Sequence, residues 1–327
     1  MGQEKMSIRL APIAADVTIG IDISKDHLDV HIHPEGCVRR FANDRAGYGS
    51  LIVWITPRQP TRIIFESTGA YHRGLERALA EAALPGVKVN PWQARRFAQA
   101  TGRRVKTDAV DAAMLARFGA TLQPEVRPAR DPQIEVLAEL LAARRALVKD
   151  RTAALNRAKN LTLALLKRQS QQHLKQIEAQ IEAIDHEQAT LVAQQADLKA
   201  RVDILCSIPG FGTLTALAML IDMPELGSLE ARQAASLGGL APVTQKSGNW
   251  QGKSRIQGGR ATLRQALYMP ALVAIRFNPP LKAIYQALRK TGKLAKVAIV
   301  AIMRRLLIMA NALLRDNRMW SLEPARA

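Results

Sequence analysis

Short apolar runs open the chain, and each has the length and composition of a β-strand. They are DVTIGIDIS at residues 16–24, LDVHIH at 28–33, TRIIFEST at 61–68 and VKVN at 87–90. The second run alternates apolar and polar residues with a period of two, as a strand with one buried face does. The pattern therefore predicts several strands within the first hundred residues.

Helical patterns separate and follow these runs. RGLERALAEAAL at 73–84 has helical spacing and ends at Pro85–Gly86, and KTDAVDAAMLARFGA at 106–120 reads as a second helix. Strands that alternate with helices are typical of an α/β fold. We therefore expect residues 1–128 to form an α/β domain with a mixed sheet.

The middle of the chain, residues 129–202, shows a different period. Its apolar positions recur in alternating steps of three and four, which is a heptad seam with two polar interruptions. The seam comprises Leu174, Ile177, Ile181, Ile184, Gln188, Leu191, Gln195, Leu198 and Val202, and upstream Leu141, Val148 and Leu155 recur every seven residues. KRQSQQH at 167–173 has no apolar anchor and predicts a turn between two helices. We expect a helical hairpin or coiled coil, and hence an oligomer; a helix packed on its own domain is the alternative.

Residues 203–327 form the third expected domain, which is mostly helical and opens with SIPGFGTLTALAML. The glycines in this segment, Gly210 and Gly212, precede an apolar helix, as in a helix-hairpin-helix element. There a tight turn brings backbone N–H groups close to a phosphate. A turn that only connects two helices is the alternative explanation of this sequence.

Charge favours the nucleic-acid interpretation. The 327 residues carry a formal net charge of +19, with a pI near 10.6. Residues 203–327 hold 17 basic and 6 acidic residues, the largest excess in the chain. Such an excess is typical of proteins that bind nucleic acid.

Other classes of protein fit the composition less well. The most apolar segment, at 294–316, is interrupted by Arg304 and Arg305, so we expect no membrane span. The N-terminus lacks the apolar region of a signal peptide. Cys37 and Cys206 are far apart, which suggests neither a disulfide framework nor a zinc site. We expect a cytoplasmic protein.

Four carboxylates stand where a metal site would need them. Asp22 interrupts an apolar strand, Glu66 ends another, and Asp108 and Asp111 lie three apart on one face of a helix. A carboxylate within an apolar strand is costly unless it is paired or binds a cation. Carboxylates from two strands and a helix can hold one or two Mg²⁺ (or Mn²⁺) ions at a phosphodiester.

Each carboxylate also has a simpler explanation. Asp108 can be a first-turn residue favoured by the helix dipole, with Thr107 as N-cap. Asp22 can end its strand in an Asx-turn, and Glu66 can pair with Arg62. The remaining acidic and histidine positions near the first two strands are expected at the surface. These are Asp26, Asp29, His31 and His33. The two histidines share a strand face and could instead bind a metal, but the site would need a third ligand that we cannot name.

Five segments together resemble the insertion-sequence 110 family of DEDD transposases. They are IGIDISKDHLDV, FESTGAYHRGLERAL, VNPWQARRFAQATGRRVKTDAVDAAMLARF, LCSIPGFGTLTAL and LGGLAPVTQKSGNWQGKSRIQGGRATLRQALYMPA. They occur in the family's order over nearly the whole chain, with the weakest likeness across the heptads. The resemblance implies an RNase H-like domain similar to the RuvC resolvase, a coiled coil, and a C-terminal transposase domain.

The resemblance also implies a chemistry. It places the family's acidic quartet on Asp22, Glu66, Asp108 and Asp111, and its nucleophilic serine on Ser247. In the family this serine forms a covalent phosphoserine bond to DNA with Mg²⁺ at the carboxylates. An RNA from the element's own end guides the enzyme to donor and target DNA, and the enzyme is expected to act as a dimer or tetramer joined through the coiled coil.

Ser247 lies in KSGNW, where we see no helical or strand signal, and Ser254 is the competing serine. A serine hydroxyl needs a base or a metal to activate it, and no histidine follows His186. Basic residues around both motifs are expected to hold nucleic-acid phosphates. They are Arg103, Arg104, Lys106, Lys253, Arg255, Arg260 and Arg264.

Three rival functions remain open at this point. A hydrolytic endonuclease of the RuvC class, acting on Holliday junctions, would use water in place of Ser247. A non-catalytic nucleic-acid scaffold would not need the carboxylates. An actin-like sugar kinase would share the IGIDIS strand, but it needs a second glycine-rich phosphate loop that we cannot place.

Overall fold

The computed structural model describes residues 16–67, 69, 71–101, 108–126, 131–244, 246–247, 250–252 and 254–321, without the side chains at 108–110, 246–247 and 250–251. The chain divides into two compact units, Met1–Arg130 and Asp131–Ala327. Each unit is described by itself below.

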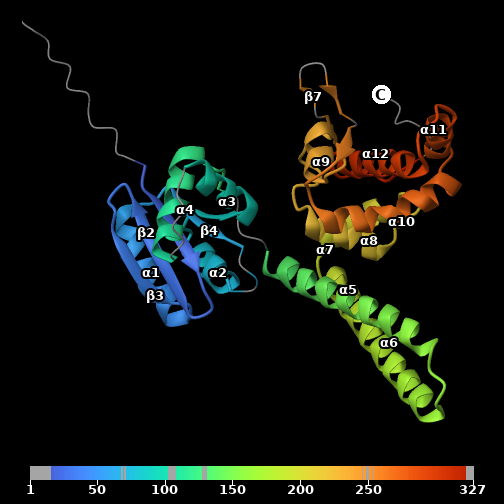
Figure 1. Ribbon diagram of the computed structural model, residues 1–327, viewed down its shortest axis with the longest axis horizontal. Helices are drawn as coiled ribbons and strands as arrows, with labels where there is room; N and C mark the ends of the chain where they lie inside the picture. The colour runs from blue at the N-terminus through green and yellow to red at the C-terminus, as the bar shows by residue number, and fades with distance from the viewer. Residues whose placement is uncertain are drawn as a thin grey trace, which may run out of the picture. The chain divides into compact units, whose positions relative to one another are not determined.

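The first unit is built on a five-stranded mixed sheet (Figure 1). Its strands are β1 (Thr18–Ile23), β2 (His27–His33), β3 (Val38–Ala42), β4 (Arg62–Glu66) and β5 (Gly86–Val89). The order across the sheet is β3-β2-β1-β4-β5. Strands β1, β2 and β3 pair antiparallel, whereas β4 pairs parallel with both β1 and β5. Strand β1 is therefore central, with a parallel neighbour on one side only.

Helices cover both faces of this sheet. They are α1 (Arg45–Ile55), α2 (Arg73–Glu81), α3 (Pro91–Ala100) and α4 (Asp108–Leu122), with a short 3-10 turn at Thr56–Arg58. Ile19, Ile21 and Ile23 of β1 belong to the core that α1 and α2 close. Ile64 of β4 belongs to a second core with Leu115 of α4. Burial on both faces explains why β1 reads as a nearly continuous apolar run.

The strands and helices expected in this unit are confirmed, but three further elements had no recognised signal. Strand β3 reads VRRFA and exposes most of its side chains. Helix α1 contains two glycines, and α3 begins at Pro91 after an Asn90 cap. Neither helix has the regular apolar period by which α2 and α4 were recognised.

The second unit begins with a helical hairpin of α5 (Pro132–Ala158) and α6 (Ala164–Ala193). Ala154 of α5 packs against Ile177 and Ile181 of α6, so the heptad seam is buried within the chain itself. The predicted turn at 167–173 is wrong, because these residues lie inside α6 and the chain turns at 159–163 instead. Lys, Arg and Gln are good helix formers, so a polar stretch without Gly or Pro continues a helix.

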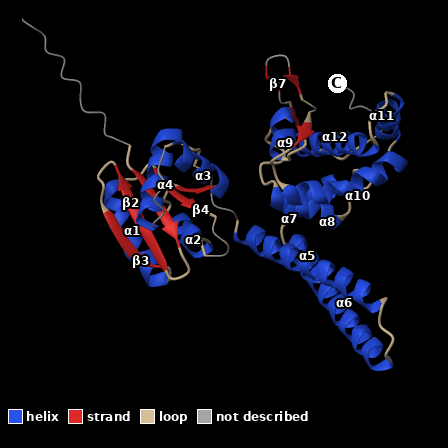
Figure 2. Ribbon diagram, in the orientation of Figure 1, coloured by secondary structure: helices blue, strands red, loops and turns tan. Residues whose placement is uncertain are grey.

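The rest of the second unit is mostly helical (Figure 2). Its helices are α7 (Ala196–Cys206), α8 (Thr213–Asp222), α9 (Ala231–Leu237), α10 (Ala261–Phe277), α11 (Pro279–Lys290) and α12 (Ala295–Arg315). They share one large apolar core, which also takes in Leu137 and Leu141 of α5. Two small ribbons, β6 (Pro242–Val243) with β9 (Arg255–Ile256) and β7 (Lys246–Ser247) with β8 (Trp250–Gln251), join α9 to α10. A mixed-sheet unit followed by a helical region agrees with the expected fold class.

Helix α12 has the length and apolar composition of a membrane span, and half of its most apolar 18-residue stretch is buried in the protein. Its inward residues include Ile302, Leu306 and Leu307, which are fully buried in the core of the second unit. A central core helix passes the same test of length and composition, so this helix is weak evidence for a membrane.

Candidate active site

Asp22 and Glu66 lie side by side, near the carboxyl ends of the neighbouring strands β1 and β4. Strands β1 and β4 run parallel, with Gly20 opposite Ile64 and Ile21 opposite Phe65. One further step along this register sets Asp22 beside Glu66. Neighbouring strands are about 4.8 Å apart, and residues two apart share a face, so both carboxylates lie on the face that carries Gly20 and Ile64. Both residues are half-buried.

Gly20 brings helix α4 down onto this same face. A Cβ at Gly20 would lie 2.0 Å from the Ala112 carbonyl oxygen and 2.3 Å from the Ala116 amide nitrogen. A Cβ at Gly119 would lie 2.6 Å from Cγ2 of Thr18. Gly20 thus permits direct backbone contact between β1 and α4, and Gly119 permits close packing of α4 on the Thr18 side chain. As β1 runs from Thr18 towards Asp22, α4 runs from Gly119 back towards its first residue.

The N-terminal end of α4 therefore points towards Asp22. The helix begins at Asp108, and Asp111 lies in its first turn and is half-buried. Residues three apart share a helix face, as the DAVD spacing predicts. The Asp108 side chain and Thr107 are outside the described part, so the first-turn capping interpretation stays a prediction. The backbone nonetheless brings all three elements that carry the quartet, β1, β4 and α4, to one place.

Arg62 is not the partner of Glu66. It lies at the opposite end of β4, where it approaches Asp16 at 4.0 Å and donates a hydrogen bond from Nε to the Pro124 carbonyl at 3.2 Å. The simpler explanation of Glu66 as half of an Arg62 ion pair is therefore wrong. Arg62 instead ties the start of β4 to the segment that follows α4.

Asp29 is a fifth carboxylate on this face, and its expected surface position is wrong. It stands directly opposite Asp22 in the antiparallel pair of β1 and β2. Only 6% of Asp29 is exposed. Arg40 of β3 donates two hydrogen bonds to it, from Nε to Oδ1 and from Nη2 to Oδ2, both 2.9 Å. The alternation in LDVHIH held the signal, because it puts Asp29 on the face opposite to Leu28 and Val30.

The donor chemistry of this site suits a hard divalent cation, since carboxylate oxygens are what Mg²⁺ takes from proteins. Among the described side chains, however, no three His, Cys, Asp or Glu are grouped closely enough to hold a metal ion. The described side chains include His31 and His33, which share the face of Asp29, but not that of Asp108. The arrangement thus supplies the right ligand types on a common face.

Ser247 lies in a strand, contrary to the expectation of no local structure. It pairs antiparallel with Trp250 in the two-residue ribbon of β7 and β8. Its side chain is outside the described part. The competing Ser254 is exposed, and its Oγ lies 3.1 Å from Oγ1 of Thr244. Both serines belong to the second unit, whereas the carboxylates belong to the first.

The glycines of the proposed phosphate turn differ in their surroundings. Gly210 has φ +96°, and a Cβ there would lie 3.0 Å from the Pro270 carbonyl oxygen of α10. Gly212 is the exposed N-cap of α8, with open space around it. Close packing on α10 therefore explains glycine at 210 without a ligand, while Gly212 is accessible.

The basic residues expected to hold phosphates are only partly described, since Arg103, Arg104, Lys106 and Lys253 fall outside the described residues. Arg255 is exposed in β9. Arg260 forms a bidentate ion pair with Glu225, with both hydrogen bonds 2.8 Å long. Arg264 donates to the Gly258 carbonyl at 2.5 Å. Arg260 thus ties the start of α10 to the segment between α8 and α9, and Arg264 ties α10 to the segment between α9 and α10, while both remain charged.

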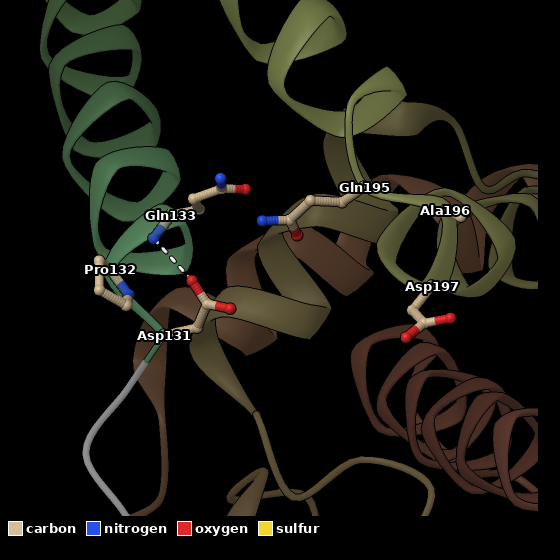
Figure 3. Close-up of a pocket in the computed structure, with 6 residues that line it drawn as sticks. All are labelled: Asp131, Pro132, Gln133, Gln195, Ala196 and Asp197. Atoms are coloured by element: carbon tan, nitrogen blue, oxygen red, sulfur yellow. Dashed lines mark hydrogen bonds between the residues drawn. The ribbon is translucent and has the colours of Figure 1, made fainter.

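Two hollows of the second unit are lined by other residues. One, of about 610 Å³, lies where α5 begins and α6 gives way to α7 (Figure 3); it is lined by Asp131, Pro132, Gln133, Gln195, Ala196 and Asp197. Asp131 there caps α5, because its carboxylate accepts the Gln133 amide at 2.7 Å. The other, of about 660 Å³, lies between α5, α8 and α10. Neither contains a residue of the expected quartet.

Two family models and several known proteins match this chain. Residues 19–166 match a family described as a DEDD transposase of the IS110 type, and residues 202–286 match the transposase family IS116/IS110/IS902. The chain is 32% identical over 316 residues to the pilin gene-inverting proteins of Moraxella lacunata and Moraxella bovis, covering 92% of this chain and 96% of each relative. It is 35% identical over 123 residues to a 42 kDa protein of insertion element IS900 from Mycobacterium paratuberculosis, covering 36% of this chain and 30% of that one.

Proposed function

The chain belongs to the IS110/IS116/IS902 family of transposases, enzymes that act on DNA, and from this premise we propose that it cuts and rejoins DNA by phosphoryl transfer at the carboxylates of its first unit. The observation that carries the proposal is the meeting of Asp22 and Glu66 under the N-terminal end of α4. In this proposal the mixed sheet is an RNase H-like domain of the RuvC type.

The carboxylates hold the cation on which this chemistry depends. We assign Asp22, Glu66, Asp108 and Asp111 as its ligands, with Mg²⁺ or Mn²⁺ as the ion. When bound, such an ion stabilises negative charge on a phosphodiester and helps to activate an attacking oxygen. Arg40 keeps the buried Asp29 paired, so this fifth carboxylate remains neutralised beside the site.

Ser247 is the proposed nucleophile. Its Oγ forms a bond to phosphorus while one phosphorus–oxygen bond of the DNA breaks, and the hydroxyl proton ends on the departing DNA oxygen. One phosphate ester replaces another, so rejoining is the same step in reverse and needs no energy source. The C-terminal stretch that carries Ser247, residues 187–327, contains no histidine to act as its base. Activation at the carboxylate site therefore requires Ser247 of this chain or of a second copy to reach it in the working assembly.

The carboxylate site is tested by a DNA cleavage and strand-exchange assay with Asp22→Asn and Asp111→Asn variants, beside Asp26→Asn as the matched control. Asp26 lies in the exposed β1–β2 turn. We expect each site variant to lose at least about 10²-fold in rate, as removal of one transition-state contact does, and the control to stay near the wild type. Full activity of Asp22→Asn would refute the assignment.

The origin of the serine is tested by mixing two inactive variants. Asp22→Asn and Ser247→Ala chains are each inactive under the proposal. If a second copy supplies the serine, a mixture regains cleavage; if the same chain supplies it, the mixture stays inactive. Cleavage by Ser247→Ala alone would support a hydrolytic, RuvC-type nuclease instead.

We further propose an oligomer and an RNA partner. The tip of the α5–α6 hairpin exposes apolar side chains that a second copy can cover, namely Leu155, Leu163, Leu165 and Leu166. A Leu163→Glu, Leu165→Glu variant should then have a lower mass by light scattering.

The guide RNA rests on the family resemblance and on the +19 charge. Sequencing of RNA protected by the purified protein tests it, and enrichment of the element's own ends is the expected result.

A further inference from the structure

The longest acid-free stretch of the chain lies at its C-terminal side. Residues 231–315 contain no Asp or Glu over 85 positions, yet they contain 15 Lys and Arg residues. Surface cations in soluble proteins are ordinarily interspersed with acids. This stretch therefore has no carboxylates of its own with which to balance its charge.

Four of these cations gather at the corner between α11 and α12. Arg289, Lys290, Lys293 and Lys296 fall within eight residues, and all four are exposed. Gly292, with φ +79°, makes the turn, and a Cβ there would meet nothing within 4 Å. We call residues 289–297 the basic corner. It is an open, outward-facing turn, unlike the turn at Gly210, which packs on α10.

The neighbouring carboxylates do not neutralise the basic corner. All five described acidic residues of positions 203–321 are engaged elsewhere. Their partners are Lys199 for Asp203, Arg145 for Asp222, Arg260 for Glu225, the backbone at the start of α9 for Glu230, and Arg315 with Arg318 for Asp316. Within the part of the chain that the structure describes, the four cations have no ion-pair partner.

We propose that the basic corner grips the phosphate backbone of duplex DNA. The inference deepens the proposed function, on which it rests, by naming a surface that holds the substrate apart from the reacting carboxylates. Arg289 donates a hydrogen bond to the Lys293 carbonyl at 2.5 Å across the turn, but none of the four side chains is neutralised by a carboxylate among the described residues. Such Lys and Arg side chains at an open turn neutralise phosphates without reading bases, so the contact is independent of DNA sequence. Leu294 and Val297, which are 73% and 52% exposed, lie between the charges and would pack on the sugar edge of the backbone.

The test is the salt dependence of binding to a labelled DNA duplex, without divalent metal, in an Asp22→Asn background that holds the substrate uncut. Each phosphate contact lowers log K by about 0.9 per unit of log salt concentration. Changing Arg289, Lys290, Lys293 and Lys296 to Gln should therefore reduce the slope by about 3.6. Between about 50 and 200 mM salt, wild-type affinity should fall about 10²-fold further than that of the variant.

A matched control removes the same charge from the α5–α6 hairpin, by changing Lys159, Lys167, Arg168 and Lys175 to Gln. Its slope should stay close to that of the wild type. An exchange of Lys and Arg for one another at the basic corner should also keep the slope, because the charges remain. Circular dichroism verifies that each variant is folded.

Three outcomes would overturn the inference. They are an unchanged slope in the corner variant, equal losses in the corner and hairpin variants, and loss of binding to anionic lipid vesicles with DNA binding unaffected. The last outcome would assign the corner to a membrane surface. If Ser247 proved not to be the nucleophile, the DNA-binding result would remain valid, because the binding assay involves no cleavage. Conversely, an unchanged slope leaves the carboxylate and serine experiments untouched.

Discussion

Gly20 is where helix α4 rests on the sheet, and replacing it with alanine should push the two elements apart. The new Cβ would lie 2.0 Å from the Ala112 carbonyl oxygen, whereas ordinary contact begins at 3.4 Å. The atoms must therefore separate by the difference, about 1.4 Å. Both nearest atoms belong to the helix backbone and cannot rotate away. Overpacking costs about 1–3 kcal/mol, and we expect the upper end here.

The same displacement should affect the reaction, because it moves Asp111 and the start of α4 away from Asp22 and Glu66. A misplacement of about 1 Å at a reacting site costs roughly 10²-fold in rate. We expect Gly20→Ala to lose that much DNA cleavage at temperatures where the protein stays folded. The variant thereby links the packing of the sheet to the chemistry of the site.

Hydrogen exchange of peptides from β1 and α4 measures the stability change within the first unit itself. Gly49→Ala is the control, because Gly49 lies within α1 and a Cβ there meets nothing within 4 Å. That change should stabilise the helix by up to about 1 kcal/mol. If Gly20→Ala protects β1 as well as the wild type does, the account of backbone contact is refuted.

Two substitutions and one labelling experiment probe other contacts. Arg40→Gln leaves the buried Asp29 without its ionic partner and should lower the free energy of unfolding of the first unit by about 1–3 kcal/mol, measured by hydrogen exchange of β2; unchanged exchange would contradict this. Gly210→Ala forces an L side chain into φ +96° and should cost about 1–2 kcal/mol in thermal unfolding of the second unit, and an unchanged melting temperature would count against it. Burial raises the pKa of the Cys206 thiol, so less of it is thiolate near pH 8 than of an exposed thiol. Maleimide at that pH should therefore label the exposed Cys37 before Cys206. Faster labelling of Cys206 would contradict its position in the partly buried end of α7.

Most strands of the first unit could be predicted, because burial determines which residue types they contain. Strand β1 is packed on both faces, so its residues are apolar in an unbroken run, and the period of two in β2 reflects its paired neighbours. Strand β3 has no such constraint, since it lies at the sheet edge and exposes Arg39 and Arg40. Its place depends on the register with β2, which is a tertiary property.

The hairpin of the second unit shows the limit of reading turns from polarity. Polar residues at 167–173 suggested a turn, but a helix needs only one buried stripe and continues through solvent-facing positions. The real turn contains Leu161 and Leu163, and Leu163 is 64% exposed. Exposed leucine at a turn cannot be foreseen from the chain alone, because it depends on what covers the tip.

For the candidate site, the types of residue were readable and their proximity was not. The spacing of Asp108 and Asp111 predicted one helix face, and the isolation of Asp22 in an apolar run marked it as unusual. That Asp22 neighbours Glu66 depends on the parallel pairing of β1 with β4. The role of Gly20 required knowing that α4 crosses β1 at that point.

The central claim is that the carboxylates of the first unit drive attack by Ser247 on DNA. Its most direct test is to incubate the wild-type chain with Mg²⁺ and a duplex from the element's ends, together with the RNA that they encode, and to map any covalent protein–DNA adduct by mass spectrometry. The account predicts a nucleotide phosphate on Ser247, abolished in Ser247→Ala and Asp22→Asn and retained in Ser254→Ala. Cleavage without an adduct, or an adduct on Ser254, would contradict it.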